Sequence, residues 1–125
     1  MDAKLKSDSL TLMRSGKIGK GTGFFKNGNH YCALGSLYCV LGIELKDRGY
    51  VSYTAADAVL GRKLADKIWL KNDGEYAADR DFARMADWIE ANVPESRPTN
   101  IDALKALLDP VPAGGKAESR ALEDV

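Results

Sequence analysis

The stretch "CALGSLYCVLGI", residues 32 to 43, decides the fold of this chain. Its leucines recur at helical spacing, and other apolar residues fill the remaining faces, so the segment predicts a helix that is apolar nearly all round. Such a helix belongs at the centre of a domain. Small residues also recur at helical spacing and predict a face on which another element packs closely: Cys32, Gly35, Ser36, Cys39 and Gly42.

Outward from this helix, hydrophobic periodicity predicts further helices over residues 3 to 14, 53 to 66 and 79 to 92, and a short one after residue 100. Asn27-Gly28 predicts a tight turn between strands at 23 to 26 and 29 to 31, and Asn72-Asp73-Gly74 predicts another turn. We therefore expect a mainly α fold, with about five helices around a central buried helix and a small β-hairpin. We expect residues 1 to 108 to form one domain and residues 109 to 125 to form a mobile tail.

Composition indicates an ordinary globular protein, with 125 residues, 45% hydrophobic and 29% charged. No apolar run reaches the length of a membrane span and the first residues lack the core of a signal peptide, so we expect a cytoplasmic protein without membrane contact. Cys32 and Cys39 lie too far apart along one helix for a disulfide. Two cysteines and one histidine do not easily complete a zinc site, although carboxylates could contribute, and we expect no metal or cofactor.

The formal net charge is zero, but residues 1 to 32 carry six cationic and two acidic side chains, a net charge of plus four. This segment could bind phosphates or an acidic partner. We favour a solvated face, because the pI near 6.6 is not typical of a nucleic-acid-binding domain. The glycines of "GKIGKGTG", residues 16 to 23, complete neither a P-loop nor a dinucleotide fingerprint, and predict a flexible linker.

Cys32 is the strongest candidate for catalysis, because the N-terminus of a helix stabilises a thiolate. His30 is close in sequence, and Asn72 or Asp73 could orient it as in Cys-His-Asn hydrolases. Two arguments favour a structural cysteine instead. The chain turns into a helix at residue 32, so imidazole and sulfur need not meet, and free cysteines are usually buried and act as small hydrophobic residues.

Asn72 and Asp73 also have two interpretations, as turn residues that bond nearby backbone or as a polar pair beside His30 at a binding surface. Trp69 is either a core or rim aromatic or a stacking platform. We predict a binding site at His30, Asn72, Asp73 and Trp69.

Two segments together resemble a small family, a domain of unknown function found in actinobacteria and their bacteriophages. Its members share a Cys-Ala-Leu-Gly-Ala-Leu-like segment and an Ile-x-x-Trp-Asn-Asp-like segment, and the resemblance covers roughly residues 3 to 92. This chain has Lys71 where the family has tryptophan. The matching positions are Cys32, Ala33, Leu34, Gly35 and Leu37, then Ile68, Asn72 and Asp73.

The resemblance implies a phage or prophage origin, hence the cytoplasm of a bacterial host, and implies no activity. We therefore expect a small accessory protein that binds a host or phage macromolecule, with a protein partner favoured over nucleic acid. The alternative is a thiol-dependent hydrolase or transferase that uses Cys32 with His30 and Asn72 or Asp73.

Overall fold

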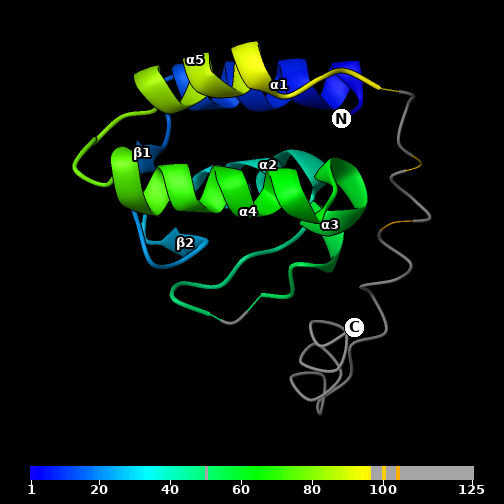
Figure 1. Ribbon diagram of the computed structural model, residues 1–125. Coiled ribbons are helices and arrows are strands. Elements are labelled where there is room, and N and C mark those ends of the chain that lie inside the picture. Colours follow the sequence, from blue (N-terminus) through cyan, green and yellow to red (C-terminus); the bar gives the residue numbers. More distant parts are fainter. Residues whose placement is uncertain (50, 97–99, 101–103, 105–125) are drawn as a thin grey trace, which may run out of the picture.

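The computed structural model describes residues 1–49, 51–96, 100 and 104. Its architecture is mainly α with a minor β component, as the sequence predicts (Figure 1). The helices are α1 (Ala3–Arg14), α2 (Ala33–Leu41), α3 (Thr54–Leu60), α4 (Arg62–Leu70) and α5 (Ala83–Asn92), with a π-helical turn η1 (Lys71–Glu75) after α4. The strands are β1 (Gly19–Lys20), β2 (Lys26–Asn27) and β3 (His30–Tyr31).

Helix α2 lies at the centre of the fold, and its central, buried position is confirmed. In Figure 1, α1 and α5 lie side by side in one layer, and α2, α3 and α4 form the layer beneath. Helix α2 contacts α1, α3 and α4. Because it meets neighbours on several sides, seven of its nine residues are buried.

Of the predicted small face, the close packing at Gly35 is confirmed. Helix α2 is shorter than the predicted segment 32 to 43, because Gly42 is its C-cap with a φ of 78° and ends the helix. A Cβ added at Gly35 would lie 2.0 Å from the carbonyl oxygen of Phe25. The same carbonyl accepts a hydrogen bond from the Cys32 N–H at 3.3 Å. Gly35 therefore lets the chain before β2 press against the first turn of α2.

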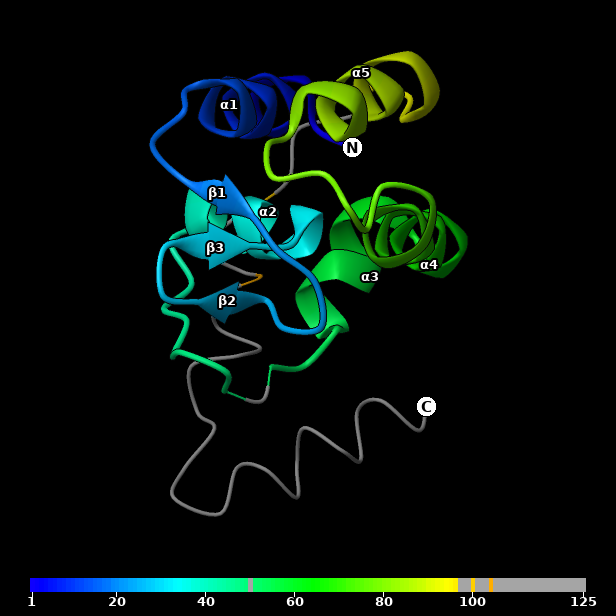
Figure 2. The same ribbon diagram turned by 90° about the vertical axis from the view of Figure 1, so that its left-hand side faces the viewer.

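The predicted hairpin is present, but its turn is one residue later than predicted. Strands β2 and β3 are antiparallel, and Asn27 pairs with His30, so the turn residues are Gly28 and Asn29. Gly28 takes the positive φ of 63° that such a turn needs at its first central position. Strand β1, in the segment predicted to be a linker, adds to β3 in parallel and gives the order β1-β3-β2 beside α2 (Figure 2).

The prediction of one helix over residues 53 to 66 is wrong, because Gly61 divides the segment into α3 and α4. Gly61 has φ 82° and ψ 147°, far from helical values. Helix α4 then continues to Leu70, beyond the predicted end. The break turns α4 back against α3, and the two helices form one side of a groove that is described below.

Two further boundaries are also corrected. Asn72-Asp73-Gly74 does not form an isolated turn but continues α4 as the π-helical turn η1, in which Asn72 is buried. Helix α5 begins at Ala83 rather than at 79, and the Asp81 side chain accepts a hydrogen bond from the Ala83 N–H at 2.9 Å. The predicted last helix and the tail lie outside the described residues, apart from Asn100 and Leu104.

Candidate functional site

The structure brings Cys32 and Asn72 together with Lys20 at the N-terminus of α2, and we call these three residues the inner cluster. Asn72 is fully buried. Its Oδ1 accepts a hydrogen bond from the Ala33 N–H at 3.1 Å, and its Nδ2 donates to the Gly21 carbonyl at 3.0 Å and to Asp73 Oδ1 at 2.7 Å. Asn72 thus joins η1, the loop after β1 and the first turn of α2, as a buried amide must when its polar atoms are to be satisfied.

Lys20 reaches the same region from β1 and is almost fully buried. Its ammonium donates to the carbonyl of Asn72 at 2.9 Å and to that of Tyr76 at 2.6 Å. Burial lowers the pKa of Lys20, and the negative charges of Asp79 and Asp73 oppose this effect. The buried ammonium fixes both ends of η1, so its role in this arrangement is structural.

Cys32 is the N-cap residue of α2, and its sulfur accepts a hydrogen bond from the Gly35 N–H at 3.3 Å. Burial raises the pKa of the Cys32 thiol to about 11, although the Gly35 hydrogen bond acts in the opposite direction. Desolvation therefore outweighs the helix-terminus effect that made Cys32 a candidate nucleophile, and the burial agrees with the structural role that the sequence favours. At neutral pH Cys32 is a protonated capping group.

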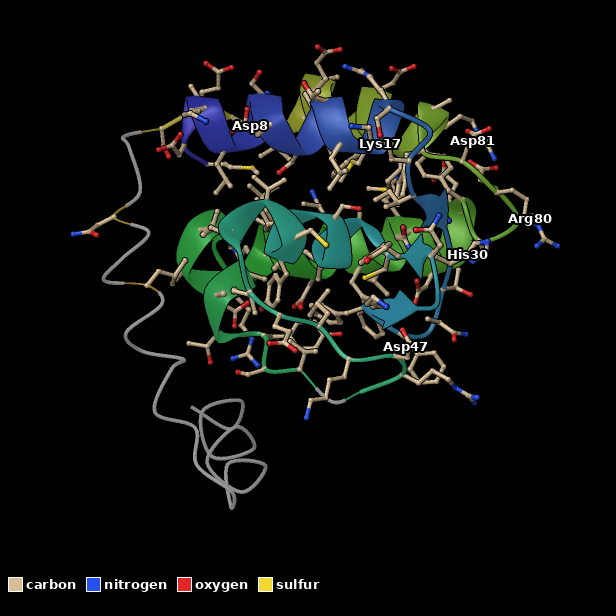
Figure 3. The ribbon with its side chains drawn as sticks, turned by 180° about the vertical axis from the view of Figure 1, so that it is seen from behind. Asp8, Lys17, His30, Asp47, Arg80 and Asp81 are labelled. Carbon is tan, nitrogen blue, oxygen red and sulfur yellow. The ribbon has the colours of Figure 1, made fainter. Side chains whose placement is uncertain are left out.

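His30 lies elsewhere, on the exposed side of the small sheet (Figure 3). Its imidazole covers β1, because a Cβ added at Gly19 would lie 2.7 Å from His30 Cδ2. The structure therefore does not bring His30 and Cys32 together as a catalytic pair. Among the described residues, His30 shares no hydrogen bond with Asn72, Asp73 or Trp69, the other three residues of the predicted binding site.

Asp73 connects the inner cluster to the surface. Its Oδ1 accepts a hydrogen bond from the Asn72 amide. Its Oδ2 accepts hydrogen bonds from the Trp69 Nε1–H at 3.1 Å and from the Gly23 N–H at 3.2 Å. Trp69 is nevertheless 41% exposed. The indole is thus held by a hydrogen bond while much of its ring remains accessible, which is how aromatic residues are used at interfaces.

Trp69 forms part of the wall of a groove of about 310 Å³, which we call the α3–α4 groove. The described residues that line it are Tyr53, Asp57, Arg62, Asp66 and Trp69. Tyr53 packs edge-on against Phe25, with ring centroids 5.3 Å apart. The two aromatic side chains of the groove are therefore each anchored to a neighbouring part of the fold.

Charges converge on the same groove. The pKa of Asp57 is raised, mainly by burial, and the nearby charge of Asp66 adds to this effect while that of Arg62 opposes it. Two carboxylates and one guanidinium thus line the groove, and the charges of Arg62 and Asp66 both act on the pKa of Asp57. Negative charges outnumber positive charges among these side chains.

Apolar surface adjoins the groove. Phe24 is 38% exposed and lies with Trp69, Tyr53, Asp73 and Cys32 along a narrow cleft of about 20 Å³. Arg48 lies over the Phe24 ring, 5.3 Å from its centroid. The cleft shares Tyr53 and Trp69 with the α3–α4 groove, so Phe24 and the groove form one continuous surface, which we call the aromatic surface.

The basic character of residues 1 to 32 is largely neutralised in the fold. Three of the six cations form ion pairs, Lys4 with Asp8, Arg14 with Asp87 and Glu90, and Lys26 with Asp47. Lys17 is exposed and forms no ion pair with another described residue. Lys6 and Lys20 are buried and donate to backbone carbonyls. This arrangement favours the interpretation of the segment as a folded, solvated face rather than a phosphate-binding one.

Sequence reasoning found Trp69 but missed the other groove residues. A signal was present, since positions 62, 66 and 69 recur at helical spacing and share one face of α4. The signal was lost because the predicted helix ended at 66, which left Trp69 outside it. The contribution of α3 depends on the break at Gly61, which periodicity alone does not show.

Within the described part of the chain, no group of three or more His, Cys, Asp or Glu side chains is arranged to hold a metal ion. The helices of that part are all too short or too polar to cross a membrane. Comparisons of the chain with family models, with curated proteins and with solved structures find no match.

Proposed function

We propose that this protein acts by binding a partner protein of host or phage origin, and that the aromatic surface is its binding site. One observation carries the proposal: Trp69 is held by Asp73 and is still 41% exposed, at the wall of a groove. Tryptophan is enriched among the residues that dominate interface energies, and a fixed ring loses little conformational entropy on binding.

The segment resemblance around Cys32 and Asn72 supports the further proposal that the protein is a phage or prophage accessory protein of an actinobacterial host, acting in the cytoplasm. The pairing of its N-terminal cations favours a protein partner over nucleic acid. The partner should therefore be sought in actinobacterial cells and in their phages.

The test is affinity capture of the tagged chain from an actinobacterial lysate, with and without phage infection, read by mass spectrometry. We expect a stoichiometric partner that is lost with Phe24→Ala/Trp69→Ala. Leu70→Ala is the matched control, because Leu70 is an apolar side chain of α4 that is 60% exposed but does not line the groove. A partner retained equally by both variants contradicts the proposal, provided circular dichroism shows that both fold.

A thiol-dependent hydrolase or transferase is the second candidate, because Cys32, Asp73 and Trp69 line one narrow cleft. Two features of the site oppose it. The cleft of about 20 Å³ has room for a single water molecule rather than a substrate, and burial raises the pKa of the thiol to about 11. Fast alkylation of Cys32 in the folded protein well below pH 8.5 would favour this candidate, and slow alkylation would exclude it.

A further inference from the structure

We infer that the α3–α4 groove takes a cationic side chain of the partner, a lysine ammonium or an arginine guanidinium, between Trp69 and Tyr53 and beside Asp57 and Asp66. This inference deepens the proposed function and rests on it. It specifies the chemistry that the aromatic surface recognises.

The aromatic residues provide the first part of the argument. Trp69 and Tyr53 line the same groove, the former on α4 and the latter just before α3. Aromatic ring faces carry negative electrostatic potential and attract a cation within about 6 Å, tryptophan most strongly. The hydrogen bond from Trp69 to Asp73 and the packing of Tyr53 on Phe25 fix both rings before a ligand arrives.

The charges provide the second part. Asp57 and Asp66 line the groove together with one guanidinium, that of Arg62. Arg62 offsets one of the two carboxylates, so these side chains leave one negative charge. A bound cation neutralises that excess, whereas a bound anion would add to it.

The size of the groove provides the third part. About 310 Å³ lies at the lower end of the volumes of small-ligand sites. A groove of this size accommodates one long side chain rather than a helix or a folded segment. The alkyl part of lysine or arginine can lie on the aromatic rings while its charged end reaches the carboxylates.

The experiment uses the full-length protein, labelled with nitrogen-15, and three small probes. n-Butylammonium represents lysine, n-butylguanidinium represents arginine, and n-butanol is the neutral control. We expect at least one cation to shift the Trp69 indole N–H signal and the amides of α3 and α4 saturably, and to bind at least fivefold more tightly than n-butanol. Equal binding of n-butanol, or no saturable shift with either cation, overturns the inference.

Charge variants locate the site. We expect Asp57→Asn/Asp66→Asn to weaken cation binding at least fivefold, whereas Asp8→Asn/Asp87→Asn, which makes the same change in net charge on α1 and α5, leaves it within twofold. Asp8 projects from α1 in the opposite layer (Figure 3). Equal effects of the two double variants overturn the inference. Exposed Asp66 alone, as Asp66→Asn, provides the same test if the first double variant does not fold.

The inference and the proposed function fail separately. If the partner is lost with Phe24→Ala/Trp69→Ala but binds Asp57→Asn/Asp66→Asn as tightly as the native protein, the proposed function stands and the cationic contact is wrong. If the cations bind but the aromatic variant retains the partner, the proposed function is wrong, and the partner uses another surface.

Discussion

Trp69 and Asn72 are three residues apart, yet Trp69 belongs to the α3–α4 groove and Asn72 to the inner cluster, two regions that differ in exposure and in hydrogen bonding. Asn72 and the rest of the inner cluster are buried, and their polar groups bond to backbone atoms of α2, η1 and the loop after β1. The α3–α4 groove is lined by aromatic and charged side chains, of which Arg62, Asp66 and Trp69 are exposed. The same short segment therefore contributes a structural residue on one side and a candidate binding residue on the other.

Asn72 and Trp69 differ in whether native hydrogen bonds must break before a ligand can bind. Each polar atom of the Asn72 amide has a protein partner, so binding a ligand there would first require native hydrogen bonds to break. Trp69 needs no such rearrangement, because its N–H is already bonded and its ring is accessible. Substitutions on the two sides should accordingly separate loss of stability from loss of binding.

Gly35→Ala should cause the largest loss of stability. The new Cβ would lie 2.0 Å from the Phe25 carbonyl oxygen, a backbone atom that cannot move alone, and we expect a loss of about 4 kcal/mol in the free energy of unfolding. Urea denaturation measures it. Gly74→Ala is the control, since nothing lies within 4 Å of its added Cβ, and should stay within about 1 kcal/mol. Equal stability of the two variants would contradict the close packing at α2.

Asn72→Ala should cause the second-largest loss of stability, because it leaves the Ala33 N–H and the Gly21 carbonyl without the amide that binds them. We expect a loss of about 3 kcal/mol in urea denaturation. Asn29→Ala, at an exposed asparagine that donates one hydrogen bond to the Lys17 carbonyl, should lose about 0.5 kcal/mol. An equally small loss of stability in both variants would mean that the hydrogen bonds of Asn72 do not support the fold.

The pH dependence of stability should report the buried thiol. Because the pKa of Cys32 is raised to about 11 in the folded state, the folded protein keeps a proton that the unfolded chain loses above its ordinary pKa near 9. Stability from this group is complete below pH 9 and declines as pH rises towards 11, by about 1 kcal/mol at pH 10. We expect Cys32→Ala to show a shallower decline between pH 8.5 and 10 in urea denaturation. Parallel declines would place Cys32 in a more solvated position.

Asp66→Asn should have the smallest effect on stability, within about 0.5 kcal/mol, because Asp66 is exposed. The same variant should weaken capture of the partner if the groove binds a cation. Thermal unfolding and capture on one preparation give both values. A large loss of stability would mean that Asp66 supports the fold, and the contrast between the groove and the inner cluster would then disappear.

Helix α1 and the central helix α2 show which features of the fold can be predicted from the sequence alone. Residues 3 to 14 were predicted with both boundaries correct, because a regular apolar stripe ends before Gly16. The close approach at Gly35 also follows from the small residues of α2. The break at Gly61 was missed because apolar residues continue at helical spacing on both sides of it. The positive φ of Gly61 does not change that spacing.

The candidate site was predictable only in part. Trp69, Asn72 and Asp73 were singled out as one site, and they are connected by hydrogen bonds through Asp73. Their unequal exposure depends on how η1 packs, which single-sequence patterns do not encode. His30 was grouped with them on proximity to Cys32 in sequence, but the strand pairing places its imidazole over β1.

Apolar periodicity and residue size act locally along the chain, so they were sufficient to predict the mainly α class, the central helix and the close packing at Gly35. The fold was needed to show that Cys32 is a buried cap with a raised pKa, that Lys20 and Asn72 stabilise the fold, and that Trp69 lines a groove. Burial and hydrogen-bond partners decide these roles, and both depend on segments that are distant in sequence and meet only when the chain folds.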